Sequence, residues 1–277
     1  QQLNLSANGI GSAGAVCIAR MLRSSSSMLS VLNLSKNELG DEGCCALFAA
    51  PPSGIDSDRS GSTYRLFHRL KEINLSQNAI GPHGCLAIAQ YLRAKAGNST
   101  SLSQSPPQRV CPLWRLNLRG NQAGNEGAVA LASALLASHH RAAKIDSALG
   151  VLNLARNAIG SAGCSSIMDA YEVLASPTTA TTASATCSTT NCQYGHPLHN
   201  CSLDLSLAGN PGMTTALFSK RRVLSARMQL QAQPVHCDLR GRELDDAAAI
   251  TIASMLRSLA SLETLDASQN EITSVGV

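Results

Sequence analysis

The chain has 277 residues, a mass of 28.9 kDa, a formal net charge of +4 and a pI near 8.6. Only 14% of its residues are charged and 3% are aromatic, which argues against a surface dedicated to nucleic acid, with its clustered basic residues and stacking rings. No apolar run is long enough to span a bilayer, and the length allows one or two domains.

One phrase returns along the chain from its first residues onward. It reads Leu-x-x-Leu-x-Leu-x-x-Asn-x-Ile-Gly-x-x-Gly, as in LNLSANGIGSAG at the start and LNLARNAIGSAG in the middle. A catalytic motif normally occurs once, whereas a recurring phrase is a building unit. Arg242 takes the place of the asparagine in one copy, CDLRGREL. The recurring asparagines are Asn8, Asn37, Asn78, Asn121, Asn157, Asn210 and Asn270. The sequence therefore predicts eight units or parts of units.

Each unit predicts a strand, a turn and a helix. The apolar residues three and five positions before the asparagine, such as Leu152 and Leu154, alternate as in a short strand with one buried side. Paired glycines such as Gly160 and Gly163 suit a tight turn, and apolar residues at helical spacing follow. Because helices connect them, successive strands are expected to run parallel. The asparagine follows the strand, where its amide can bond backbone groups of its own and adjacent units.

These leucines, asparagines and glycines resemble the leucine-rich repeats of the ribonuclease-inhibitor-like subfamily. The resemblance implies an α/β fold, a right-handed horseshoe solenoid with parallel strands on the concave face and helices on the convex face. Five units match closely, and the later units depart from the pattern. Gly212 stands where an Ile is expected, Arg242 replaces the asparagine, and Ala267 replaces a leucine. We therefore expect the C-terminal units to be less regular.

The predicted domain organisation is a single repeat domain over residues 1–277, apparently cut at both ends because each terminus falls inside a unit. A unit of this type needs roughly 28–29 residues. The longer spacings predict insertions between one helix and the next strand, rich in Ser, Thr, Gly and Pro, which are either tolerated loops or docking arms ordered only against a partner. They cover residues 51–66, 95–110, 138–148 and 175–200.

Two patterns could indicate a cofactor or a metal. The segment GIGSAG, residues 9–14, matches a dinucleotide fingerprint, but sister units read AIGPHG and ELGDEG, so its first glycine is a coincidence. The longest insertion holds five potential zinc ligands at spacings that match no standard zinc pattern, so loop composition is the preferred interpretation and a zinc-stapled loop the alternative. They are Cys187, Cys192, His196, His199 and Cys201. We predict no cofactor, no metal and no catalytic residue.

Other cysteines and one basic cluster have structural interpretations. Cys44, Cys85 and Cys164 share one position of the unit where other copies have Ala, which indicates a small buried helix site with reduced thiols. Reduced thiols predict an intracellular protein, most simply a cytoplasmic one. A location in a cytoskeletal, ciliary or organellar assembly is the alternative. Residues 219–222, SKRR, are interpreted as a solvated helix end, with a nuclear signal or a phosphate contact as alternatives.

The solvent-facing strand positions predict a polar concave face with a modest basic patch. Trp and Arg are frequent interface anchors, so the candidate partner-binding residues come from this face. Trp114 could instead pack against the insertion before it. The candidates are Trp114, Arg115, Arg119, Arg156, Arg240 and Lys36.

The resemblance implies a protein-binding role, because similar proteins are inhibitors, innate sensors, actin regulators, Ran GTPase activators or subunits of ciliary and ribosomal assemblies. We predict a non-catalytic scaffold, a structural subunit of a larger assembly, with one or more protein partners and no small-molecule substrate, nucleic acid or membrane. The irregular Ala- and Ser-rich spacers favour this subunit role. The alternative is a regulator of a small GTPase, which would need an Arg or Asn at a loop edge.

Overall fold

The computed structural model describes residues 1–23, 29–48, 70–97, 113–141, 149–174, 203–232, 235–257 and 262–273. Strands and helices alternate along this part of the chain, and each strand with the helix after it is called a unit, numbered by its strand. The elements are β1 (Gln2–Asn4), α1 (Ser12–Arg23), β2 (Val31–Asn33), α2 (Gly40–Phe48), β3 (Glu72–Asn74), α3 (Pro82–Gly97), β4 (Arg115–Asn117), α4 (Gly124–Arg141), β5 (Val151–Asn153), α5 (Ser161–Leu174), β6 (Asp204–Ser206), α6 (Thr215–Ala232), β7 (His236–Asp238), α7 (Asp246–Leu256) and β8 (Thr264–Asp266).

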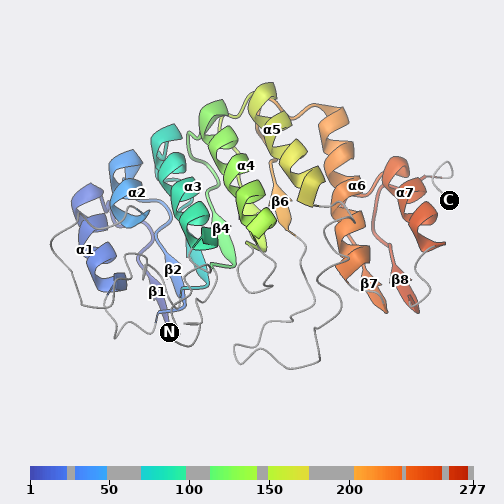
Figure 1. Cartoon of the computed structure of the whole chain (residues 1–277), viewed down its shortest axis with the longest axis horizontal. Helices are drawn as coiled ribbons and strands as arrows, with labels where there is room; N and C mark the ends of the chain where they lie inside the picture. Colours follow the sequence, from blue (N-terminus) through green and yellow to red (C-terminus); the bar gives the residue numbers. More distant parts are fainter. Residues whose placement is uncertain are drawn as a thin grey trace.

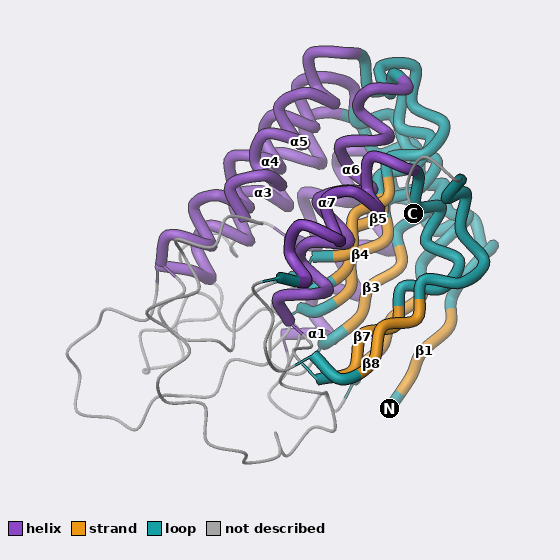
Figure 2. Tube along the Cα trace, turned by 90° about the vertical axis from the view of Figure 1, so that its right-hand side faces the viewer, coloured by secondary structure: helices purple, strands orange, loops and turns teal. Residues whose placement is uncertain are grey.

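The units stack side by side into an arc, with the helices along its outer side and the strands along its inner side (Figure 1). Viewed along the arc, the strands form one layer and the helices a second layer behind it (Figure 2). Strands β1 to β6 form one parallel sheet in sequence order, and β7 and β8 form a separate parallel pair. The predicted α/β leucine-rich-repeat solenoid is confirmed.

The core lies between the two layers. The central residues of strands β2 to β7 and one face of each helix are buried, as Leu116 of β4 and Ile88 of α3 show, both at 0% exposure. Cys44, Cys85 and Cys164 are buried as predicted. Burial raises the pKa of the Cys85 thiol to about 12, so this thiol stays protonated and unreactive at neutral pH.

A side-chain amide connects each unit to the one before it. Asn121 of unit 4 shows the full pattern: its Oδ1 accepts the backbone N–H groups of Asn78 (2.9 Å) and Ile80 (3.1 Å) in unit 3. Its Nδ2 donates to the carbonyls of Leu75 in unit 3 (3.0 Å) and Leu118 in its own unit (2.8 Å). One buried amide thus satisfies backbone groups of two units that would be costly to leave unpaired.

The same rung recurs at five other positions. Asn37, Asn210 and Asn270 each accept two N–H groups from the preceding unit and donate to carbonyls of both units. Asn78 and Asn157 donate in the same way, and each accepts one longer bond of 3.4 Å. Asn8, in the first unit, donates only to Ser6 of its own unit. These amides form an asparagine ladder along the solenoid.

The ladder is missing one rung, at Arg242 in unit 7. Strands β6 and β7 do not pair with each other, and this is the one place between β1 and β8 where consecutive strands are separate. Figure 1 shows β7 and β8 set apart from β6. The apolar core divides at the same place: Leu224 of α6 belongs to the large core, and Ala226 belongs to a second, small one. The expectation of a less regular C-terminal end is confirmed.

The other departure in this region has a packing cause. Gly212 lies directly against unit 5, where a Cβ would come within 2.0 Å of the carbonyl carbon of Gly160. Its N–H donates to the carbonyl of Ile159 at 2.9 Å. An isoleucine, which the repeat pattern has at this position, would collide with the backbone of unit 5.

A second inter-unit contact involves the starts of the helices. Asp41 of unit 2 accepts the N–H groups of Gly81 (2.7 Å) and Gly84 (2.8 Å) at the start of α3 in unit 3. A Cβ on Gly84 would fall 2.8 Å from the same carboxylate oxygen, so a glycine is needed for this close approach. Asn125 of unit 4 makes the equivalent bonds to unit 5. Helices α3 and α5 are therefore capped at their N-termini by the preceding unit.

The structure shortens two of the predicted insertions. Helix α3 extends to Gly97 and α4 to Arg141, so residues 95–97 and 138–141 are helical rather than parts of a loop. The rest of the predicted insertions lies outside the described residues.

The ladder predicts a specific loss of stability. We expect Asn121→Ala to lower the free energy of unfolding by about 2–4 kcal/mol, because it leaves two buried N–H groups without an acceptor and removes one of the two amide donors to the carbonyls of Leu75 and Leu118. Chemical denaturation followed by circular dichroism measures this.

Asn117→Ala is the matched control, because the Asn117 side chain accepts one exposed bond from Arg119 (3.1 Å), and it should cost less than about 1 kcal/mol. Equal losses for the two variants would contradict the role of the ladder.

Candidate functional site

The inner face carries exposed cations on units 4 and 5. Arg119 and Arg156 follow β4 and β5 and are exposed, and neither side chain forms an ion pair with another described residue. Arg156 has a positive φ of 54°, and its Cγ lies over Gly209 of unit 6, where a Cβ would approach it to 2.9 Å. The aliphatic part of the Arg156 side chain thus lies close to the backbone of the next unit.

Trp114 and Arg115 lie at the start of β4, on the same unit as Arg119. The Trp114 ring packs against Gly150 of unit 5, where a Cβ would fall 1.9 Å from Cζ3 of the ring, so Gly150 provides the space that the indole needs. The ring is half-buried. Nη1 of Arg115 lies 3.7 Å from Oε2 of Glu72, a solvent-exposed pair of small energetic value. Trp114, Arg115, Arg119 and Arg156 are called the basic strip below.

The structure separates the other two candidates from the basic strip. Arg240 follows β7, beyond the break in the sheet, and its guanidinium contacts Asp238 (2.8 Å) and Asp266 (3.4 Å). The hydrogen bonds from Arg240 lower the pKa of Asp238 to about 2. Two carboxylates therefore neutralise this cation. Lys36 is exposed on unit 2, two units away from the strip.

The basic cluster on α6 is not a solvated helix end, and that interpretation was wrong. Residues 219–222 lie within α6, and the side chains of Arg221 and Arg222 are only 18% exposed. Lys220 contacts Glu172 of α5 at 2.7 Å. Arg222 contacts Asp245 at 3.7 Å and Glu271 at 3.1 Å, both on the far side of the break. Consecutive basic residues thus connect unit 5 to units 7 and 8 where the ladder has no rung.

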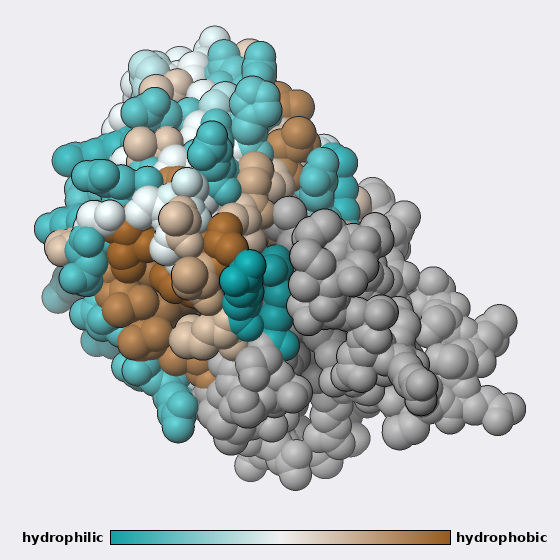
Figure 3. Space-filling model, turned by 90° about the vertical axis from the view of Figure 1, so that its left-hand side faces the viewer, coloured by the Kyte–Doolittle hydropathy of each residue, from teal (hydrophilic) through white to brown (hydrophobic). Residues whose placement is uncertain are grey.

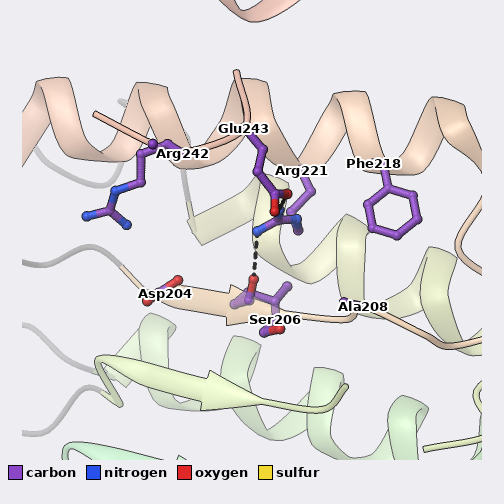
Figure 4. A pocket seen from close by; sticks show the side chains of 9 residues that line it. Asp204, Ser206, Ala208, Phe218, Arg221, Arg242 and Glu243 are labelled. Carbon is purple, nitrogen blue, oxygen red and sulfur yellow. Dashed lines mark hydrogen bonds and ion pairs between the residues drawn. The ribbon is translucent and has the colours of Figure 1, made fainter. Parts of the chain in front are cut away.

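Arg221 lies in the opening between β6 and the turn after β7. Its Nη1 donates to the carbonyl of Leu205 in β6 (3.2 Å), and its Nη2 lies 3.6 Å from Glu243 (Figure 4). A cavity of about 260 Å³ separates β6 from this turn. Its lining residues are Asp204, Leu205, Ser206, Ala208, Phe218, Arg221, Gly241, Arg242 and Glu243. The sequence did not predict this site, although Arg242 at the position of a ladder asparagine is a signal for it.

The end of the solenoid at unit 1 is apolar (Figure 3). Val16 and Met21 of α1 are 38% and 41% exposed. Leu3 and Leu5 are half-buried at the edge of the large core. In the units that follow, the corresponding surface packs against the preceding unit.

The described residues contain no group of three or more His, Cys, Asp or Glu placed to hold a metal ion. The potential zinc ligands at residues 187–201 lie outside the part of the chain that the structure describes. Among the described helices, none is long and apolar enough to cross a membrane.

Comparison with known families agrees with this architecture. A family model described as a leucine-rich repeat matches residues 1–19, 25–48, 68–89, 111–132 and 149–168. These are the five regular units, and each matched segment contains a strand and the start of a helix. Each matched segment is therefore similar to a leucine-rich repeat. No curated protein matches the chain.

The ion pairs at the break predict a salt-dependent contribution to stability. We expect Arg222→Ala to lower the free energy of unfolding by roughly 1–2 kcal/mol, because Asp245 loses its cation in a half-buried site. The loss stays below that of a buried pair because Glu243 and Glu271 are mostly exposed, and it should shrink at high salt.

Unfolding experiments at low and high salt measure this loss. Arg227→Ala is the matched control on the same helix, because Arg227 forms no ion pair within the described ranges. A salt-independent loss, or equal losses for both variants, would contradict the account.

Proposed function

We propose that the chain is a non-catalytic scaffold that binds other proteins through its inner face and serves as a structural subunit of a larger assembly. The observation that carries this proposal is the basic strip. It places exposed guanidinium groups on adjacent units, and Arg119 and Arg156 have no ion pair to any described residue. The repeats themselves, as a class of interaction module, support a binding role.

The ladder suits this role because it holds the strands in one register without using their exposed side chains. Leu116 of β4 pairs with Ile73 of β3 and Leu152 of β5, so the cations of units 4 and 5 have fixed positions. A preorganised surface loses little conformational entropy on binding. Its charge favours a partner with an acidic surface, which electrostatic complementarity would steer and orient.

We also propose that the partners are one or more proteins, that the protein is intracellular and most simply cytoplasmic, and that its repeats belong to the ribonuclease-inhibitor-like subfamily. The six described cysteines are all free, which supports a reducing compartment. The repeat length, the asparagine and the paired glycines support the subfamily.

Affinity purification with quantitative mass spectrometry tests the basic strip. The double variant Arg119→Glu, Arg156→Glu should recover its main partners at roughly a tenth of the wild-type level or less, because it reverses two charges at the interface.

Arg20→Glu, Arg257→Glu is the matched control, since both arginines are exposed on the helical side at α1 and just after α7. A partner set that both double variants retain equally would overturn the proposal. Cross-links to a few stoichiometric neighbours in native extract would support the subunit role, and one sub-stoichiometric partner would contradict it.

Regulation of a small GTPase is a second candidate. The favouring observation is that Arg119 and Arg156 are exposed on turns at the edge of the sheet, where an arginine could reach a nucleotide bound to a partner. An activator of this kind accelerates GTP hydrolysis, and removal of its arginine typically costs about 10³-fold or more. Hydrolysis by the GTPases present in the purified complexes should then slow with Arg119→Ala or Arg156→Ala. No acceleration by the wild type would remove this candidate.

A further inference from the structure

We propose that the opening between β6 and β7 is a docking site for an extended segment of a partner protein, which pairs with β6 as an added strand and brings a carboxylate to Arg242. This inference rests on the proposed role in protein binding, but it uses a surface separate from the basic strip.

The first argument is the unpaired edge of β6. In unit 5, the N–H groups of Leu154 and Arg156 donate to Ser206 (2.8 Å) and Ala208 (2.9 Å) of unit 6. The equivalent groups of unit 6 belong to Leu207 and Gly209, and they make no such bond to unit 7 in the described structure. An open strand edge is a template for another backbone.

The second argument is that a side chain takes the place of the missing strand. In a parallel sheet, the carbonyls of one strand accept N–H groups of the next. At Leu205 the donor is instead Nη1 of Arg221, which reaches from α6 across the opening (Figure 4). A backbone N–H of an incoming segment can replace Nη1 of Arg221 as the donor to the Leu205 carbonyl, now 3.2 Å away. Arg221 then keeps its ion pair with Glu243.

The third argument is the shape and charge of the opening. Its volume of about 260 Å³ leaves room for a short stretch of extended chain between β6 and residues 241–243. Glu243 contacts Arg221 and Arg222, whereas Arg242 has no ion pair among the described residues. Figure 4 shows Arg242 on the β7 side of the opening, above Asp204. The unneutralised cation favours a segment with an acidic side chain at this place.

The ladder adds a requirement for an asparagine. The N–H of Asn157 is accepted by the side chain of Asn210 at 2.7 Å, whereas the N–H of Asn210 has no acceptor among the described residues, because a guanidinium such as that of Arg242 cannot accept a hydrogen bond. The carbonyl of Leu118 receives two side-chain amides, from Asn121 of its own unit and Asn157 of the next, whereas the carbonyl of Leu207 receives one, from Asn210. A partner segment with an asparagine after its strand would complete this rung.

The probe is a fluorescein-labelled synthetic peptide with the sequence EINLSQNAIG, which copies residues 72–81 of this chain. It carries a Glu at the first strand position, the alternating apolar residues and the ladder asparagine. Fluorescence anisotropy with the full chain should show saturable binding. Peptides with Asn78→Ala or Glu72→Lys should bind about tenfold more weakly, the equivalent of ~1.4 kcal/mol.

Variants of the chain test the site itself. Arg242→Asn supplies the missing rung internally and removes the cation, so it should weaken peptide binding about tenfold or more. Arg221→Ala removes the side chain that occupies Leu205 and should strengthen binding, while Arg227→Ala should leave it unchanged. Circular dichroism confirms that each variant is folded.

The outcomes separate this inference from the proposed function. The Arg119→Glu, Arg156→Glu variant should bind the peptide as well as the wild type, because the basic strip lies elsewhere. Equal binding of the peptide and its Asn78→Ala analogue, or an unchanged affinity for Arg242→Asn, would overturn the inference. Absence of peptide binding together with self-association that Arg242→Asn abolishes would also overturn it, in favour of a second copy of the chain as the occupant.

Discussion

The side-chain amide of one asparagine per unit is the interaction on which this structure depends. A short strand and a helix cannot bury their apolar sides alone, so the unit is stable only when its neighbours are in place. The Asn121 amide accepts from unit 3 and donates to units 3 and 4, which fixes the register of two strands with one buried group. Where this amide is present, consecutive strands pair, and at Arg242, where it is absent, they do not.

The break also shows what replaces the amide. Lys220, Arg221 and Arg222 extend from one helix to unit 5, β6 and units 7 and 8. Ion pairs tolerate larger distances than hydrogen bonds to the backbone, so they join the two sheets without forcing them into one register. The presence of Arg242 in place of the ladder asparagine therefore leaves the edge of β6 unpaired on the inner face. The continuous sheet of units 1 to 6 provides one surface, and the break before unit 7 provides a distinct one.

The sequence predicted the elements and their order because each unit carries its own short-range pattern. Contacts between units were harder to predict. Asp41, Asn125 and Asp246 share a position four residues after the ladder position, a signal that only units 2, 4 and 7 carry. The burial of Arg221 and Arg222 depends on where units 7 and 8 lie, which no local pattern encodes. The neutralisation of Arg240 could have been predicted, because Asp238 and Asp266 occupy the same column of adjacent strands.

Site-resolved hydrogen exchange at two consecutive ladder positions tests the account most directly. The N–H of Asn157 is held by the amide of Asn210 at 2.7 Å, and the N–H of Asn210 has no acceptor among the described residues, since Arg242 takes the ladder position of the next unit. The account predicts that the Asn157 amide exchanges only through large-scale unfolding and that the Asn210 amide exchanges at least about a hundredfold faster. Equal protection at both amides would show that the strands remain joined without the asparagine, and it would contradict the central claim.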